Sequence, residues 1–271
     1  MMRGVLHKIV LEVWLGTLAF AIGLFVIKAL LTLILPQFQA ELSELAMSIP
    51  FLRSMLSALL GAEVGEELTS SMIEGVLWAH PLVLSMPWAH EMLLCTRVPA
   101  GEVDRGTIDV LLGLPVSRRR LFLAESFVWL ASGVFILAAG WVGDLAGRTM
   151  LAGVETANAW HGVLVALNLG CLYVAVGGFA FLVSALSSRR GVALGIVFAM
   201  VLASFLLVFI AEFWAPARSL VFLSLLDYYR PAQVLGAGRL PLGDVAVLLG
   251  LGVVMWTAAG VVFMRRDVRT I

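Results

Sequence analysis

Charge is scarce in this sequence. Charged residues make up 13% and hydrophobic residues 61% of the 271 residues, whereas a soluble domain averages about 25% charged and about 45–50% apolar. Lysine is the rarest of the charged residue types, with only Lys8 and Lys28. Neither lysine stands in a GxxxxGK motif, so the sequence contains no P-loop for nucleotide phosphates. The 18 basic and 18 acidic residues cancel, and nothing in this balance indicates binding to nucleic acid.

Cysteine and histidine are also few. Cys95 and Cys171 lie far apart in or beside apolar runs, which excludes a disulfide framework and a CxxC site. His90-Glu91 begins like the HExxH helix of zinc proteases, but Leu94 stands where the second histidine is needed. The histidines are too scattered to form a metal-ligand set: His7, His80, His90 and His161. No catalytic residue, metal or cofactor is therefore predicted on this chain, and an intramembrane enzyme is the least supported function.

Long uncharged apolar runs are what the sequence has in abundance. A membrane-spanning helix needs roughly 20 such residues, so the runs predict an all-α membrane protein, folded as a single domain over residues 1–271. Six transmembrane helices are expected, at about 13–35, 75–96, 121–142, 160–187, 191–211 and 245–264. The second run contains prolines and ionisable residues, and without it five spans would place the two termini on opposite sides.

The arginines and lysines set the orientation. With six spans and both termini cytoplasmic, most of them fall on the cytoplasmic side, as the positive-inside rule requires. The prediction is thus a multi-pass protein of the cell inner (cytoplasmic) membrane. Lys28 lies in the outer part of the first span and is expected to snorkel outward, while Glu74, Asp144 and Arg148 are expected on the external side. Residues 49–61 are apolar at helical spacing and predict an external helix along the membrane interface.

The segment between the second and third spans is too charged to cross a bilayer and too apolar for a solvated loop. Glu102, Arg105 and Asp109 recur at steps of three and four, which places them on one helical face. The apolar residues from 108 to 112 form another face. These spacings predict a short amphipathic helix at the cytoplasmic surface, ended by Pro115.

The residues that follow leave two roles open for this helix. Ser117 is predicted to be the N-cap of the third span. The next three residues, Arg118–Arg120, would hold the helix to anionic lipid. Alternatively, the helix is a docking surface for a soluble partner protein.

A family resemblance bears on this choice. The segment EVDRGTIDVLLGLPVSR (Glu102–Arg118) resembles the cytoplasmic signature of ABC-type-2 exporter permeases, which typically reads ExxxGTxxxLLxxPVSR after the second span. The ending FMRRDV (Phe263–Val268) is similar to the RRD ending of these permeases, and SLLDYYRP (Ser224–Pro231) resembles their external segment before the last span. The matching residues of the signature are Glu102, Gly106, Thr107, Leu111, Leu112, Pro115, Ser117 and Arg118.

This resemblance implies the permease subunit of an ABC exporter. Its coupling helix would seat on a separate ATP-binding subunit that holds ATP and Mg, and a second permease copy or a paralogue would complete the transporter. The first, second and fifth spans would tilt to open a path. The non-transporting alternative is a membrane anchor or mechanotransmission subunit. The residues assigned to coupling are Glu102, Arg105, Gly106, Thr107, Asp109, Leu111, Leu112, Pro115 and Arg118.

One position departs from the family pattern. Many members carry lysine seven residues after Arg118, where this chain has Glu125. The substitution implies different salt bridges between the start of the third span and the ATP-binding subunit.

Polar and small residues inside the predicted spans are further candidates. Ionisable groups in spans normally face the bundle interior or a cavity, which indicates a transport pathway or buried polar packing for His80, Glu91 and Asn168. Gly191 and Gly195 form a GxxxG pattern in the fifth span. This pattern allows close approach of another helix, either from the same chain or from a second copy in a dimer.

Overall fold

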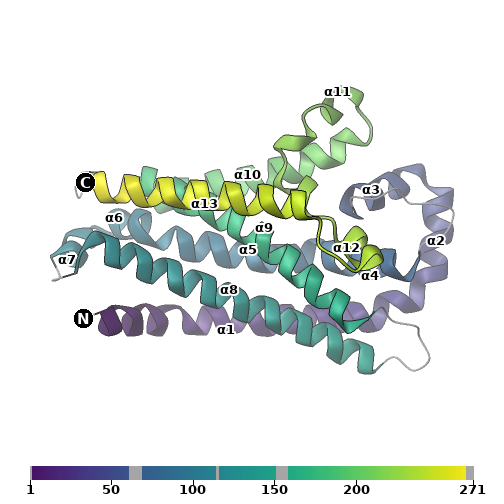
Figure 1. Ribbon diagram of the computed structural model, residues 1–271, viewed down its shortest axis with the longest axis horizontal. Helices are drawn as coiled ribbons and strands as arrows, with labels where there is room; N and C mark the ends of the chain where they lie inside the picture. The colour runs from purple at the N-terminus through teal and green to yellow at the C-terminus, as the bar shows by residue number, and fades with distance from the viewer. Residues whose placement is uncertain (1, 61–68, 114–115, 151–157, 267–271) are drawn as a thin grey trace.

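The computed structural model describes residues 2–60, 69–113, 116–150 and 158–266, and its regular secondary structure in these ranges is helical. The long helices run side by side along one axis (Figure 1). Five of the described helices are long and apolar enough to cross a membrane, which confirms a multi-pass, all-helical membrane protein. They are α1 (Met2–Ile34), α8 (Arg118–Thr149), α9 (Ala159–Leu186), α10 (Arg190–Ala211) and α13 (Leu242–Arg265).

Three predicted spans keep their positions and two are longer than predicted. Helices α9, α10 and α13 begin and end within a few residues of the predicted fourth, fifth and sixth spans, whereas α1 begins at Met2 and α8 continues to Thr149. The 32 residues of α8 extend about 48 Å at 1.5 Å per residue, against about 30 Å for the hydrocarbon core of a bilayer. Asp144 and Arg148 therefore belong to the last turns of α8, beyond the predicted end of the third span, and their external position stays a prediction.

The predicted second span is not one continuous helix. Residues 75–96 lie mainly in α4 (Ser70–Ala79) and α5 (Pro81–Cys95), which meet at His80. Pro81 has no N–H to donate and disfavours the α conformation in the residue before it. His80 accordingly has φ −58° and ψ 133°, and its side chain caps the start of α5.

The two ends of the described chain lie at the same end of the bundle. Figure 1 shows α1 starting and α13 ending beside α6 (Glu102–Asp104) and α7 (Ile108–Leu112). Helix α5 lies along the same axis and is packed against α1, α8 and α9. We call the end that carries α6 and α7 the α7 end.

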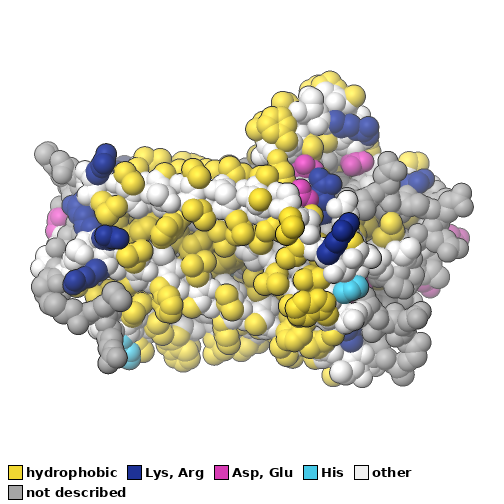
Figure 2. Space-filling view, viewed as in Figure 1, with side chains coloured by type: hydrophobic (Ala, Val, Ile, Leu, Met, Phe, Trp, Pro, Cys, Tyr) yellow, Lys and Arg dark blue, Asp and Glu magenta, His cyan; other side chains and the backbone are white. Residues whose placement is uncertain are grey.

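The type of side chain on the surface changes along the long axis of the bundle. On the face shown in Figure 2, hydrophobic side chains cover the middle of the bundle, and Lys and Arg side chains lie toward both of its ends. Large apolar residues on the long helices, such as Leu15, Phe127 and Phe198, are more than half exposed. An apolar surface of this extent indicates contact with lipid.

Glycine contacts join the long helices in two close pairs. Helices α1 and α8 pack along much of their length, and a Cβ at Gly143 of α8 would lie 2.3 Å from the carbonyl oxygen of Phe25 in α1. In the second pair, a Cβ at Gly178 of α9 would lie 2.3 Å from the carbonyl oxygen of Gly252 in α13. Small residues allow such close approach of backbones, which drives helix association in membranes through van der Waals packing.

Short helices fold over the end opposite α7. Helix α3 confirms the helix predicted over residues 49–61. Its Phe51 packs against Phe209 of α10 and against Phe213, which follows the end of α10, with ring-centroid distances of 5.7 and 5.9 Å. The position of α3 along an outer membrane interface stays a prediction. The short helices at this end include α2 (Gln39–Ser48), α3 (Pro50–Leu60), α11 (Ala215–Arg218) and α12 (Pro231–Ala237).

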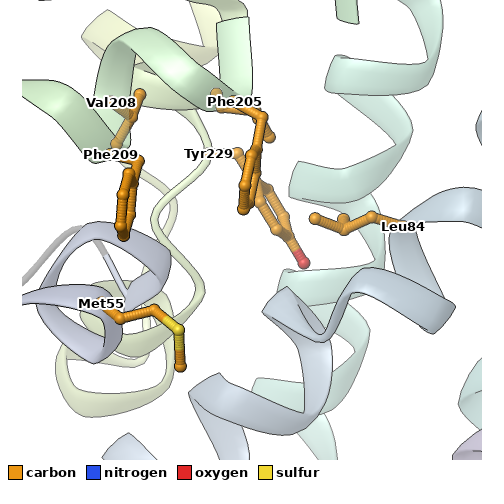
Figure 3. Close-up of a pocket in the computed structure, with 7 residues that line it drawn as sticks. Met55, Leu84, Phe205, Val208, Phe209 and Tyr229 are labelled. Atoms are coloured by element: carbon orange, nitrogen blue, oxygen red, sulfur yellow. The ribbon is translucent and has the colours of Figure 1, made fainter. Parts of the chain in front are cut away.

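A narrow apolar crevice lies where α3, α5 and α10 meet (Figure 3). Its volume is about 20 Å³, which accommodates about one water molecule. In this conformation the crevice therefore has no room for a larger molecule. Its lining includes Met55 of α3, Leu84 of α5, Phe205, Val208 and Phe209 of α10, and Tyr229.

Candidate functional site

The segment predicted to be one amphipathic helix forms two short helices around a glycine turn. Gly106 has φ +68°, a left-handed conformation that glycine adopts without strain from a Cβ. The turn separates α6 from α7, so Glu102 and Asp109 do not share one continuous helical face. The prediction of a single helix is wrong here, because periodicity does not report the left-handed turn that glycine permits.

Glu102 and Thr107 hold this turn. The Thr107 hydroxyl donates to the Glu102 carboxylate at 2.6 Å, and the Thr107 N–H donates to the Glu102 carbonyl at 3.0 Å. Partial burial acts to raise the pKa of Glu102, but the hydrogen bond from Thr107 and the charge of Arg105 outweigh it, so this pKa lies below its usual value. The resulting stabilisation is complete above the unfolded-state pKa and is lost as the pH falls through the lowered pKa of the folded state.

The segment presents charge outward and buries an apolar side chain. The side chain of Arg105 is 53% exposed, and Asp109 is also exposed. Ile108 is completely buried, as expected for the apolar face. Three predicted coupling residues lie outside the described part of the structure, either in their side chains or altogether: Leu111, Leu112 and Pro115.

The base of the segment is anchored to two long helices through Arg97. This residue opens η2 (Arg97–Gly101) and forms salt bridges with Glu12 of α1 and Glu125 of α8. Glu125, which stands where the resembling permeases have lysine, is 3% exposed and points into the bundle. Its charge is thus paired within the chain.

Further hydrogen bonds link the segment to α5, α9 and α10. The Ala100 N–H donates to the Ser184 hydroxyl of α9 at 3.3 Å. At the start of α10, the backbone N–H of Arg190 donates to Asp104 at 3.3 Å, and its guanidinium donates to the Leu93 carbonyl of α5 at 2.7 Å. The base of the segment is therefore connected to α1, α5, α8, α9 and α10.

Ser117 and Arg118 organise the start of α8. Ser117 is its N-cap, as predicted, and accepts from the N–H of Arg120 at 3.4 Å. Arg118 donates to the carbonyl of Arg266 at 2.6 Å, in the region after α13 where helix-end carbonyls lack partners within the helix. Arg118 thus joins the first turn of α8 to the end of α13, and its contact with a partner protein stays a prediction.

The predicted pathway residues occupy separate positions. His80 caps α5 at the break between α4 and α5. Glu91 and Asn168 are completely buried, and among the described residues neither side chain has a hydrogen-bond partner. His90, by contrast, shares a hydrogen bond of 3.1 Å with Tyr173. The structure therefore buries Glu91 and Asn168 in the bundle but does not bring the three predicted residues into one site.

A comparison with known families covers nearly the whole chain. The model of the ABC-2 family transporter protein matches residues 10–268. This chain belongs to the ABC-2 transporter family. No curated protein matches it. Membrane proteins of this family generally partner with ABC ATP-binding subunits, and together with the apolar helices this membership indicates a transporter permease.

The ABC-2 protein also contains an ionic cluster that was not predicted. At the end opposite α7, Lys28 of α1 lies 3.0 Å from Asp144 of α8, and Arg148 bridges Asp144 and Glu74 at 2.8 and 3.0 Å. Lys28 is completely buried, with its Nζ 4.0 Å from the ring centroid of Trp78. The expected snorkelling of Lys28 is wrong for the folded protein, because counter-charge lies inside the bundle. The sequence does contain a signal for the pair of Lys28 and Asp144, because these opposite charges stand near the same ends of two predicted spans.

The GxxxG pattern of the ABC-2 protein is open to the outside. Gly191 and Gly195 are exposed, and a Cβ at either position would meet no described atom within 4 Å. Packing within the chain therefore has no support among the described residues. The alternative, contact with a second copy, stays a proposal.

Proposed function

We propose that the ABC-2 protein is the permease subunit of an ABC exporter in the cell inner membrane, and that residues 102–113 dock on a separate ATP-binding subunit. The supporting observation is that exposed charges at Arg105 and Asp109 stand on a base tied to the bundle through Arg97. A helix that served only as a lipid anchor would turn its apolar face to the bilayer. Ile108 is instead buried against the protein, which favours a protein partner for the exposed charges.

In this proposal α4 and α5 together form the second of six spans, and the α7 end faces the cytoplasm. The 10 and 15 residues of these helices add to about 37 Å at 1.5 Å per residue, enough to cross a hydrocarbon core of about 30 Å. Basic side chains exposed near the ends of α1, α8, α10 and α13 follow the positive-inside rule. They are Lys8, Arg119, Arg120, Arg189 and Arg265.

The remaining parts of the transporter are supplied by partners. ATP and Mg bind to the ATP-binding subunit, which carries out hydrolysis, and a second permease copy or a paralogue packs on the open face at Gly191 and Gly195. A non-transporting anchor or mechanotransmission subunit would use the same docking surface. Transport by the complex reconstituted in lipid vesicles separates these two functions.

Replacing Arg105 and Asp109 together by alanine is expected to abolish co-purification with the ATP-binding subunit. Residues at the centre of an interface contribute about 2–4 kcal/mol each when they are hot spots, so the dissociation constant rises by a factor of roughly 30 to 1,000 for each residue replaced. The measurement is the amount of ATP-binding subunit retained with the affinity-purified protein, together with its rate of ATP hydrolysis.

Arg239→Ala is the matched control, because Arg239 is also exposed but lies between α12 and α13, at the end opposite α7. It is expected to retain the partner. Size-exclusion chromatography of each variant establishes that the permease is folded. Wild-type binding and wild-type ATP hydrolysis in the double variant would contradict docking through residues 102–113.

A further inference from the structure

Arg97 lies between the docking segment and the transmembrane bundle. It follows closely after the end of α5 and opens η2, which leads directly into α6. From this position one guanidinium nitrogen reaches Glu12 of α1 and another reaches Glu125 of α8. The side chains of Arg97 and Glu125 are 12% and 4% exposed, so neither belongs to the surface that meets the ATP-binding subunit.

The two acids that bind Arg97 belong to helices that are fixed to each other. Helices α1 and α8 pack along much of their length, and toward the end opposite α7 they are joined both by the close contact at Gly143 and by the salt bridge of Lys28 with the adjacent Asp144. A shift of Arg97 that leaves both helices behind would break its buried contact with Glu125 and its partly exposed contact with Glu12. A shift that carries α1 and α8 along keeps these contacts, so the geometry favours joint movement.

The other anchors of the docking segment lead to different helices. The Arg190 contacts connect it to α5 and α10, and the Ser184 contact connects it to α9. Among the anchoring contacts of the described residues, the salt bridges of Arg97 are those that reach both α1 and α8. Loss of Arg97 should therefore remove the side-chain contacts of the segment with this pair, so that α1 loses its link to the segment while α8 keeps only the chain connection that precedes Arg118.

We propose that Arg97 is the positioning residue that transmits movement of residues 102–113 to the pair formed by α1 and α8. The inference rests on the proposed function, because the docked ATP-binding subunit starts the movement. It also gives Glu125 a role, since its carboxylate completes the Arg97 contact. A lysine at this position would place a second cation against Arg97.

Hydrogen–deuterium exchange of the purified complex with its ATP-binding subunit tests this proposal. The complex is compared without nucleotide and with ATP plus orthovanadate. In the wild type, nucleotide is expected to change the exchange of residues 102–113 and also of residues 4–12 in α1. In Arg97→Gln, the change at 102–113 remains and the change at 4–12 is lost. Arg239→Gln, which removes an exposed arginine elsewhere, retains both changes.

A second variant tests the proposal even if Arg97→Gln does not fold. Glu125→Gln preserves size but removes the charge, and the same selective loss at residues 4–12 is expected. If Arg97 and Glu125 only stabilised the structure, each variant would change the exchange of residues 4–12 in the absence of nucleotide. The difference in exchange that nucleotide produces at residues 4–12 would then stay the same as in the wild type. That result in both variants overturns the proposal. If residues 102–113 do not respond to nucleotide in the wild type, the docking function itself fails and the inference fails with it.

Discussion

Asp144→Ala is expected to destabilise the protein by about 3–5 kcal/mol, the usual cost of removing one partner from a buried ion pair. The side chain of Asp144 is 1% exposed and binds Lys28, Thr32 and Arg148. Without it, two cations remain in the cluster against the carboxylate of Glu74. The loss is measured as a lower midpoint of thermal unfolding in detergent micelles, followed by tryptophan fluorescence.

The double variant Lys28→Met with Asp144→Leu is the matched control. It removes both members of one pair and leaves Arg148 with Glu74. Replacing a buried ion pair by apolar residues is often neutral or stabilising, so the double variant should be more stable than Asp144→Ala alone. Equal midpoints for the wild type and Asp144→Ala would show that this carboxylate does not hold the cluster together.

Alanine at Gly143 or Gly178 is expected to destabilise the protein by about 1–3 kcal/mol, the usual cost of overpacking. The direction is opposite to helix propensity, which favours alanine over glycine by about 1 kcal/mol. The new Cβ would lie 2.3 Å from a backbone oxygen, that of Phe25 or that of Gly252. Backbone atoms in a helix cannot move aside as the end of a flexible side chain can, so the paired helices must separate.

Two glycines on partner helices provide controls for these variants. A Cβ at Gly16 of α1 or Gly250 of α13 would meet no described atom within 4 Å. Gly16→Ala and Gly250→Ala should therefore leave the unfolding midpoint unchanged or raise it slightly. If Gly143→Ala and Gly178→Ala behaved in the same way, the close pairing of α1 with α8 and of α9 with α13 would be refuted.

Hydropathy located α9, α10 and α13 well because each is a single apolar run bounded by charged or turn residues. The same averaging did not show the break in the helix within residues 75–96, where one local feature decides the structure. Pro81 breaks the helix whatever the mean hydropathy of the window. Neither did hydropathy reveal that α8 continues as a helix past residue 142, because tertiary packing on α1 supports its charged final turns.

Local chemistry predicted part of the candidate site. The Ser117 cap and the burial of Ile108 depend on neighbours in sequence, and both were confirmed. The turn at Gly106 was also encoded locally, by a glycine next to a threonine that can donate to Glu102. Helical periodicity alone obscured this turn because it treats every position as a regular helical step.

The ion pairs could not be predicted from the sequence alone. Arg97 with Glu125 and Lys28 with Asp144 join residues that lie far apart in the chain. Each of these charges could have faced lipid headgroups, a partner protein or the bundle interior. The choice depends on how each helix is rotated about its axis, which emerges only when the helices pack together.

The buried pair of Lys28 and Asp144 also has a consequence for how the chain enters the membrane. The ribosome makes Lys28 well before Asp144, so α1 is inserted while its lysine has no partner on α8. An unpaired lysine at the centre of a span costs about 2.5–3.5 kcal/mol on insertion scales, and a long side chain near a helix end lowers this cost by reaching toward the headgroups. We therefore expect Lys28 to reach outward in the nascent chain and to turn inward when α8 packs on α1, so that pairing with Asp144 fixes the position of α1.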